Sequence, residues 1–164
     1  MDKNILLKGL LTHLVNEHNI LITAANNARA ASIDEQSVAE TQYDTLAIEA
    51  GYLAEGQAKR AAEINLAIEQ IKALTLMSFN ESSAINMGAL VQIEQFKCAQ
   101  PNNNQWYFIA PAGAGFTMKF EQCSVTVITP QSPLGQSMIN KYVGDDIELP
   151  QANKAFAAEI LCVR

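Results

Sequence analysis

The chain has 164 residues, of which 49% are hydrophobic, and its formal net charge is −6 at neutral pH. This length suits one compact domain or two small modules, and the hydrophobic content suffices for a core, which argues against a disordered chain. Acidic residues outnumber basic residues in both halves. Neither half therefore has the basic excess that a phosphate backbone requires, and we expect a protein partner and no direct sequence-specific DNA binding.

The sequence predicts neither a membrane-spanning segment nor disulfide bonds. The first apolar run, residues 4–15, is interrupted by a lysine and a histidine and is too short to span a bilayer. Cys98, Cys123 and Cys162 are widely spaced in apolar, strand-like stretches, and the sequence has no CxxC pair. We interpret them as reduced thiols in or near the core of a cytoplasmic protein.

The first half predicts two long helices. Side chains recur at alternating spacings of four and three, which is the seam of a coiled coil. The first seam consists of Leu7, Leu11, Leu14, His18, Leu21, Ala25 and Ala28, and the second of Leu46, Ala50, Leu53, Gln57, Ile64, Ile68 and Ile71. A polar stretch, about residues 31–43, separates them, so the helices are expected to fold back as an antiparallel coiled-coil finger over residues 1–78.

Two overlapping signals could open the second helix. Residues 32–35 and residues 37–40 both have serine followed three positions later by glutamate, the capping-box pattern. In that interpretation Glu35 or Glu40 closes the box, and Asp34 favours the positive end of the second helix. The two starts remain alternatives at this stage.

After a polar linker at residues 80–83 the pattern changes to short strands, which predicts an α+β domain over residues 84–164. Ser132 and Pro133 fit the N-cap and first position of one short helix, and Gly144 marks the turn into the next strand. The predicted strands are Ala89–Phe96, Trp106–Ala110, Cys123–Ile128, Asp146–Leu149 and Lys154–Val163.

Two further stretches of the second half have structural interpretations. Gly113 and Gly115 are expected in a hairpin turn, because no third glycine opens a helix after them. Residues 106–108, Trp-Tyr-Phe, are expected to form a buried strand and not a platform for stacking bases.

Residues 127–146, with the sequence VITPQSPLGQSMINKYVGDD, resemble the carboxy-terminal signature of the GreA/GreB family of transcription elongation factors. In that signature a strand leads to Ser-Pro, a helix, a lysine, Gly-Asp and a final strand. Residues 40–60 are similar to the tip and second helix of a short, diverged GreA/GreB-like subgroup. The resemblance implies an antiparallel α-helical coiled coil followed by an FKBP-like β-sheet domain with one short helix.

The resemblance also implies a function. The carboxy-terminal domain would dock on RNA polymerase beside its secondary channel, through Ser132, Pro133, Lys141, Gly144 and Asp145. The finger would enter the channel, where acidic tip residues would help to hold a second Mg²⁺ and an attacking water while the polymerase cleaves backtracked RNA. The chain would not be an enzyme itself and would bind no cofactor on its own, sharing Mg²⁺ with the polymerase active site.

The tip candidates are Glu40, Glu35, Asp34 and Asp44, with Tyr43 as a contact residue and Glu40 as a transient Mg²⁺ ligand. Two acidic residues three positions apart mark the family's tip. If Glu40 takes the second place, Ser37 falls at the first, and serine is a weak Mg²⁺ ligand.

Three functions therefore remain open. The chain stimulates cleavage, or it occupies the channel without cleavage and competes with active factors, or it is an interaction module with a changed partner. It is expected to be a monomer or a weak dimer.

Overall fold

A computed structural model describes residues 2–35, 44–95, 105–120, 123–151 and 154–164. Their contacts divide the chain into two compact units. The sheet unit comprises Met1–Leu10 and Gln70–Arg164, and the hairpin unit comprises Leu11–Glu69. Among the described residues, no helix combines the length and apolar character needed to cross a membrane.

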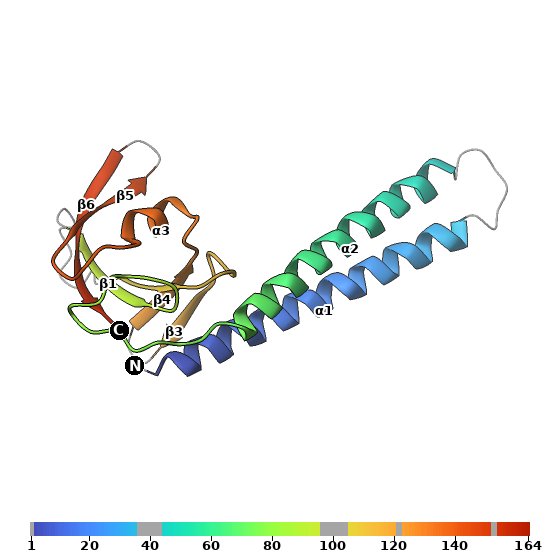
Figure 1. Cartoon of the computed structure of the whole chain (residues 1–164). Coiled ribbons are helices and arrows are strands. Elements are labelled where there is room, and N and C mark those ends of the chain that lie inside the picture. Colours follow the sequence, from blue (N-terminus) through green and yellow to red (C-terminus); the bar gives the residue numbers. More distant parts are fainter. Residues whose placement is uncertain (1, 36–43, 96–104, 121–122, 152–153) are drawn as a thin grey trace. The chain divides into compact units, whose positions relative to one another are not determined.

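The hairpin unit is formed by two long helices, α1 (Lys3–Glu35) and α2 (Asp44–Lys72), which run antiparallel (Figure 1). The predicted α1 seam is confirmed from Leu14 onward, where Leu14, Leu21 and Ala25 are buried. Before Leu14 the fully buried residues are Leu6 and Leu10, and the predicted Leu7 and Leu11 are half-buried. The carboxylate of Glu17 on α1 also accepts a hydrogen bond of 3.4 Å from the guanidinium of Arg60 on α2. This ion pair is solvent-exposed and contributes at most about 1 kcal/mol, so apolar burial holds the helices together.

The predicted α2 seam is wrong at Leu53. The Leu53 side chain is 56% exposed, whereas Ala61 is 1% exposed and buried in the seam. Between Ala50 and Gln57, either Leu53 or Ala54 satisfies the alternation of three and four residues. In the structure Ala54 is the half-buried residue of the two and belongs to the seam. Small seam residues let two helices lie close together, so packing selects alanine over the larger leucine.

The first capping-box interpretation is also wrong. Residues 32–35 are the last residues of α1 and do not open α2. No glycine or proline stands between Ala30 and Glu35, so nothing local stops the helix there. Asp34 accordingly lies near the carboxyl end of α1 and not at the positive end of α2. The second candidate start, residues 37–40, lies outside the described residues.

The sheet unit contains a mixed six-stranded sheet with the order β3-β4-β2-β1-β6-β5. The β2–β4 pair is parallel and the other neighbouring pairs are antiparallel. The strands are β1 (Leu90–Gln95), β2 (Gln105–Ile109), β3 (Thr117–Phe120), β4 (Cys123–Ile128), β5 (Asp146–Gln151) and β6 (Lys154–Val163).

All five predicted strands are present, and the bounds of β4 and β6 are as predicted. The strand missed by the sequence prediction is β3, a four-residue edge strand that buries only Phe120 fully. An edge strand with exposed polar side chains gives little hydrophobic signal in the sequence.

Gly113 and Gly115 have φ values of +80° and +88°, which confirms that they form turns suited to glycine. The hairpin prediction for them is wrong, however. They connect β2 to β3, and these two strands do not pair with each other, since both pair with β4. The glycines therefore carry the chain across the intervening strand.

The core of the sheet unit is apolar on both faces of the sheet. Trp106 and Phe108 are 5% and 0% exposed, which confirms the buried-strand interpretation. Leu6 and Leu10, from the first turns of α1, are buried in the same unit. Cys123 and Cys162 are free and half-buried, as expected, while Cys98 lies outside the described residues. One cluster, which the helix α3 (Pro133–Met138) joins through Met138, consists of Ile85, Ala89, Val91, Ile93, Ile109, Ile128, Met138, Ile147, Ala158, Ile160 and Val163.

Candidate functional site

The turn that opens α3 has the geometry that its sequence predicts. Ser132 is the N-cap, with φ −66° and ψ 151°, and Pro133 follows at the start of the helix. The Ser132 hydroxyl accepts a hydrogen bond of 3.1 Å from the Gly135 N–H and donates one of 2.7 Å to the Thr129 carbonyl. One side chain thus caps the helix and ties it to the residue that follows β4.

Replacing Ser132 with alanine is expected to lower the free energy of unfolding by about 1 kcal/mol, because the cap is lost and the Gly135 N–H is left without its acceptor. Chemical denaturation of the purified chain measures this change. Ser124→Ala is the control, because Ser124 is an exposed residue of β4. Equal stability of the two variants would contradict the capping role.

The far end of α3 is fixed by the segment that precedes β1. Asn140 has a φ of +63°, and its N–H donates to the Ile85 carbonyl at 2.9 Å. The Ile85 N–H in turn donates to the Lys141 carbonyl at 2.8 Å. This exchange holds the Lys141 backbone in place while its side chain is exposed to solvent.

Gly144 and Asp145 form the turn into β5. Gly144 has a φ of +87°, and its N–H donates to the Ile160 carbonyl at 2.8 Å. The Asp145 carboxylate accepts from the Tyr142 N–H at 2.8 Å. Asp145 is half-buried, and its carboxylate closes this turn through the hydrogen bond from Tyr142. The structure thus gives this predicted docking residue an internal role.

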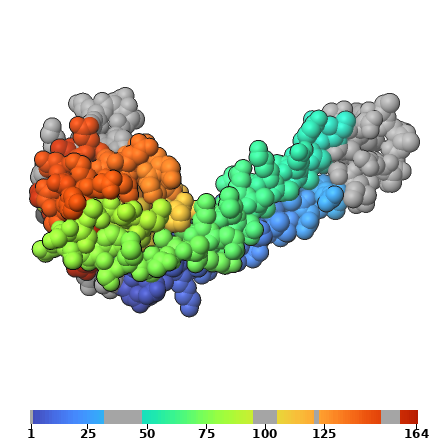
Figure 2. Space-filling model, viewed as in Figure 1, coloured from blue at the N-terminus to red at the C-terminus, as the bar shows by residue number. Residues whose placement is uncertain are grey.

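The five predicted docking residues lie together around α3, and they differ in accessibility. Pro133, Lys141 and Gly144 are exposed, whereas Ser132 and Asp145 are half-buried and engaged in local hydrogen bonds. Figure 2 shows this part of the chain, in orange, at the surface of the sheet unit.

Tyr142 was not predicted as a docking residue. Its side chain is 47% exposed beside Lys141. An aromatic residue between lysine and a Gly-Asp turn is the only signal in the sequence that could have indicated it. Aromatic side chains that stay exposed are favoured at protein interfaces, so Tyr142 extends the candidate surface.

The structure describes only part of the predicted tip. Glu40 and Tyr43 lie outside the described residues. Asp34 and Glu35 are at the end of α1, and Asp44 is the first residue of α2, so the backbone brings all three to the same end of the hairpin unit (Figure 1). Within the described part of the chain, no group of three or more metal-ligating side chains comes together.

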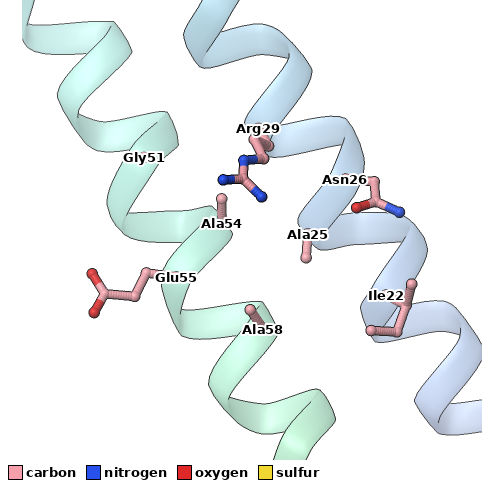
Figure 3. A pocket seen from close by; sticks show the side chains of 8 residues that line it. All are labelled: Ile22, Ala25, Asn26, Arg29, Gly51, Ala54, Glu55 and Ala58. Atoms are coloured by element: carbon pink, nitrogen blue, oxygen red, sulfur yellow. The ribbon is translucent and has the colours of Figure 1, made fainter.

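The hairpin unit also has a shallow groove of about 480 Å³ between α1 and α2. Figure 3 shows that small side chains hollow it out, with Arg29 extending toward α2 and Glu55 pointing away. The lining contains no nucleophilic side chain paired with an acid or a base. The lining residues are Ile22, Ala25, Asn26, Arg29, Gly51, Ala54, Glu55 and Ala58.

Neither a scan against protein-family models nor a search of curated proteins found a match to this chain. Among solved structures, the chain is similar to GreA factor homolog 1 of Thermus thermophilus, with 16% identity and a TM-score of 0.39 over 96% of this chain and 94% of that one. It is similar to Gfh1 of Thermus aquaticus, with 16% identity and a TM-score of 0.38 over 95% and 92%.

A third similar structure is the prokaryotic transcription elongation factor GreA/GreB from Nitrosomonas europaea. It has 13% identity and a TM-score of 0.37, over 61% of this chain and 78% of that one. Identities and TM-scores at this level do not by themselves assign the chain to a family.

Proposed function

We propose that this protein regulates transcription elongation by binding RNA polymerase beside its secondary channel. The sheet unit would dock through the surface around α3, and the hairpin unit would enter the channel. One observation carries the proposal: residues 127–146 combine the order of the GreA/GreB signature with the local geometry which that order requires. Strand, Ser-Pro cap, helix, exposed lysine, Gly-Asp turn and strand follow one another in the described chain.

The dimensions of the hairpin unit support this proposal. The part of α1 that belongs to this unit runs from Leu11 to Glu35, and at a rise of about 1.5 Å per residue it is about 38 Å long. An antiparallel pair of such helices is a stiff element that can carry side chains at its turn deep into a partner. The net charge of −6 favours a partner with a basic surface.

Cleavage of backtracked RNA would be carried out by the polymerase. Glu40, with Glu35, Asp34 or Asp44, would contribute oxygen ligands to a second Mg²⁺ held mainly by the polymerase. Two metal ions stabilise the entering and leaving oxygens of a phosphodiester displacement, and one or two added carboxylates suffice to recruit a largely hydrated Mg²⁺.

A second candidate function is occupation of the channel without cleavage. Ser37 stands at the place where the resemblance puts the first acidic residue of the tip. Its neutral hydroxyl holds Mg²⁺ much less well than a carboxylate does. A factor of this kind would compete with cleavage factors or block backtracked RNA.

Stalled, backtracked elongation complexes with labelled RNA and Mg²⁺ test both candidates. Release of short 3′ fragments above the intrinsic rate supports cleavage stimulation. No stimulation, together with competition against an active cleavage factor, supports occupation of the channel alone. If the protein neither stimulates cleavage nor competes with an active cleavage factor, polymerase is not its partner. The remaining candidate would then be an interaction module with a changed partner.

The docking surface is tested by charge reversal at Lys141. Lys141→Glu is expected to weaken polymerase binding about tenfold, because it places a repulsive charge in a complementary interface. The matched control is Lys119→Glu, which reverses an exposed charge on β3 of the same unit. Affinity can be measured by fluorescence anisotropy, and equal affinities of the two variants would exclude the α3 surface as the docking site.

A further inference from the structure

Lys3 makes an unusual set of contacts at the start of α1. Its ammonium donates hydrogen bonds to three main-chain oxygens from three separate parts of the sheet unit. The acceptors are Met77, Gly88 at 3.0 Å and Arg164 at 3.2 Å. A lysine ammonium has three protons to donate, so these contacts use its full capacity.

An aromatic ring completes the environment. The Lys3 Nζ lies 4.6 Å from the centroid of the Phe79 ring, within the range of a cation–π contact. Burial lowers the pKa of Lys3, whereas contact with oxygens and with a ring face stabilises an ammonium in its charged form. Three oxygens of the main chain and one ring face thus surround the cation.

The acceptors Gly88 and Arg164 lie at one end of the β1–β6 strand pair. Gly88, with a φ of +82°, makes the bend before β1, and its N–H donates to the Ile109 carbonyl. Arg164 and Leu90 exchange both of their main-chain hydrogen bonds, at 2.8 and 2.9 Å. The Arg164 oxygen therefore accepts from Leu90 and from Lys3. The ammonium lies where the segment after α2, the bend before β1 and the residue after β6 come together.

We propose that Lys3 is a charged latch that fastens the first turn of α1 to the sheet unit. Without the ammonium, the residues of that turn before Leu6 unfold locally, while the six-stranded sheet stays folded. Leu6 is the first buried apolar residue of the helix. Asp2 still caps the turn, since it accepts from the Asn4 N–H at 2.9 Å, but a cap without tertiary contacts does not hold an isolated helical turn.

Amide hydrogen exchange tests the latch at two positions. In an α-helix the Leu7 and Lys8 amides bond to the carbonyls of the first turn, so their exchange reports its opening. Lys3→Met, which keeps the apolar stem and removes the charge, is expected to raise their exchange rates at least about tenfold, with the amides of β2 and β4 unchanged. The control is Lys59→Met, the same change at an exposed position of α2.

Unchanged exchange at Leu7 and Lys8 in Lys3→Met would overturn the proposal. A second measurement uses the unaltered protein and does not depend on the folding of a variant. A lowered pKa leaves more of the free amine, but Lys3 must first break its three hydrogen bonds to react. It is therefore expected to react with an amine-directed ester at least about tenfold more slowly than the exposed Lys59, and equal rates would likewise overturn the proposal. Phe79→Leu, which removes the ring face and keeps the charge of Lys3, is expected to bring the reaction rate of Lys3 closer to that of Lys59.

Discussion

Gly135→Ala is expected to lower the free energy of unfolding of the sheet unit by about 3 kcal/mol, at the upper end of the range for overpacking a tight site. A Cβ added at Gly135 would lie 2.0 Å from the Thr129 carbonyl oxygen and 3.0 Å from the Ser132 Oγ. The first of these atoms is main chain and the second is fixed by the N-cap, so neither can yield without opening the turn. Chemical denaturation monitored through Trp106, which is buried in the sheet unit, measures the loss.

Gly56→Ala is the matched control for this substitution. Gly56 lies within α2, and a Cβ there meets nothing within 4 Å. Alanine is a better helix former than glycine, so this variant is expected to be about 0.5–1 kcal/mol more stable. A Gly135→Ala chain as stable as the parent would show that the turn between β4 and α3 is less constrained than its contacts indicate.

Glu40→Ala is expected to return RNA cleavage in backtracked complexes to the intrinsic rate of the polymerase, while the affinity for polymerase is unchanged. The proposed role of the residue is to supply an oxygen ligand to the second Mg²⁺, and alanine has none. Cleavage of end-labelled RNA and a parallel binding measurement separate these two effects.

The control for this variant is Glu63→Ala, which removes an exposed carboxylate of α2 far along the helix from its start. It is expected to retain full stimulation. Stimulation by Glu40→Ala equal to that of the control would remove Glu40 from the mechanism and direct attention to Asp34, Glu35 and Asp44. This test applies once the unaltered protein has been shown to stimulate cleavage.

The sequence predicted best those elements whose signals are local. Ser132 and Pro133 determine the start of α3 through their own hydrogen-bonding and dihedral preferences, and the structure confirms them. The apolar residues of β4 and β6 likewise predicted the bounds of these strands. In each case the deciding interactions lie within a few residues of the pattern.

The errors arose where tertiary packing decided between equal local patterns. Leu53 and Ala54 both fit the seam of α2, and only contact with α1 selects the alanine. Residues 32–35 fit a helix start as well as a helix interior, and the absence of any breaker lets α1 continue through them. The short edge strand β3 is recognisable only once β4 is beside it.

The sequence predicted where the candidate docking residues lie in the fold, but not the local contacts of each. The sequence grouped Ser132, Lys141 and Asp145 around one helix, and the structure places them there. It could not show that the Asp145 carboxylate closes the turn at Tyr142, because that contact depends on the turn's three-dimensional path. Side-chain exposure, which separates Lys141 from Asp145, has no local signature either.

The strand order of the sheet unit has a consequence for how the protein folds. β6 comes last among the strands in the sequence but lies inside the sheet, between β1 and β5, so that Val91 is aligned with Val163. Such distant pairing requires a large loop to close before its contacts form, whereas α1 and α2 follow each other in the chain. Contacts between elements distant in sequence form more slowly than those between neighbours, so the two helices can associate before β6 has joined the sheet.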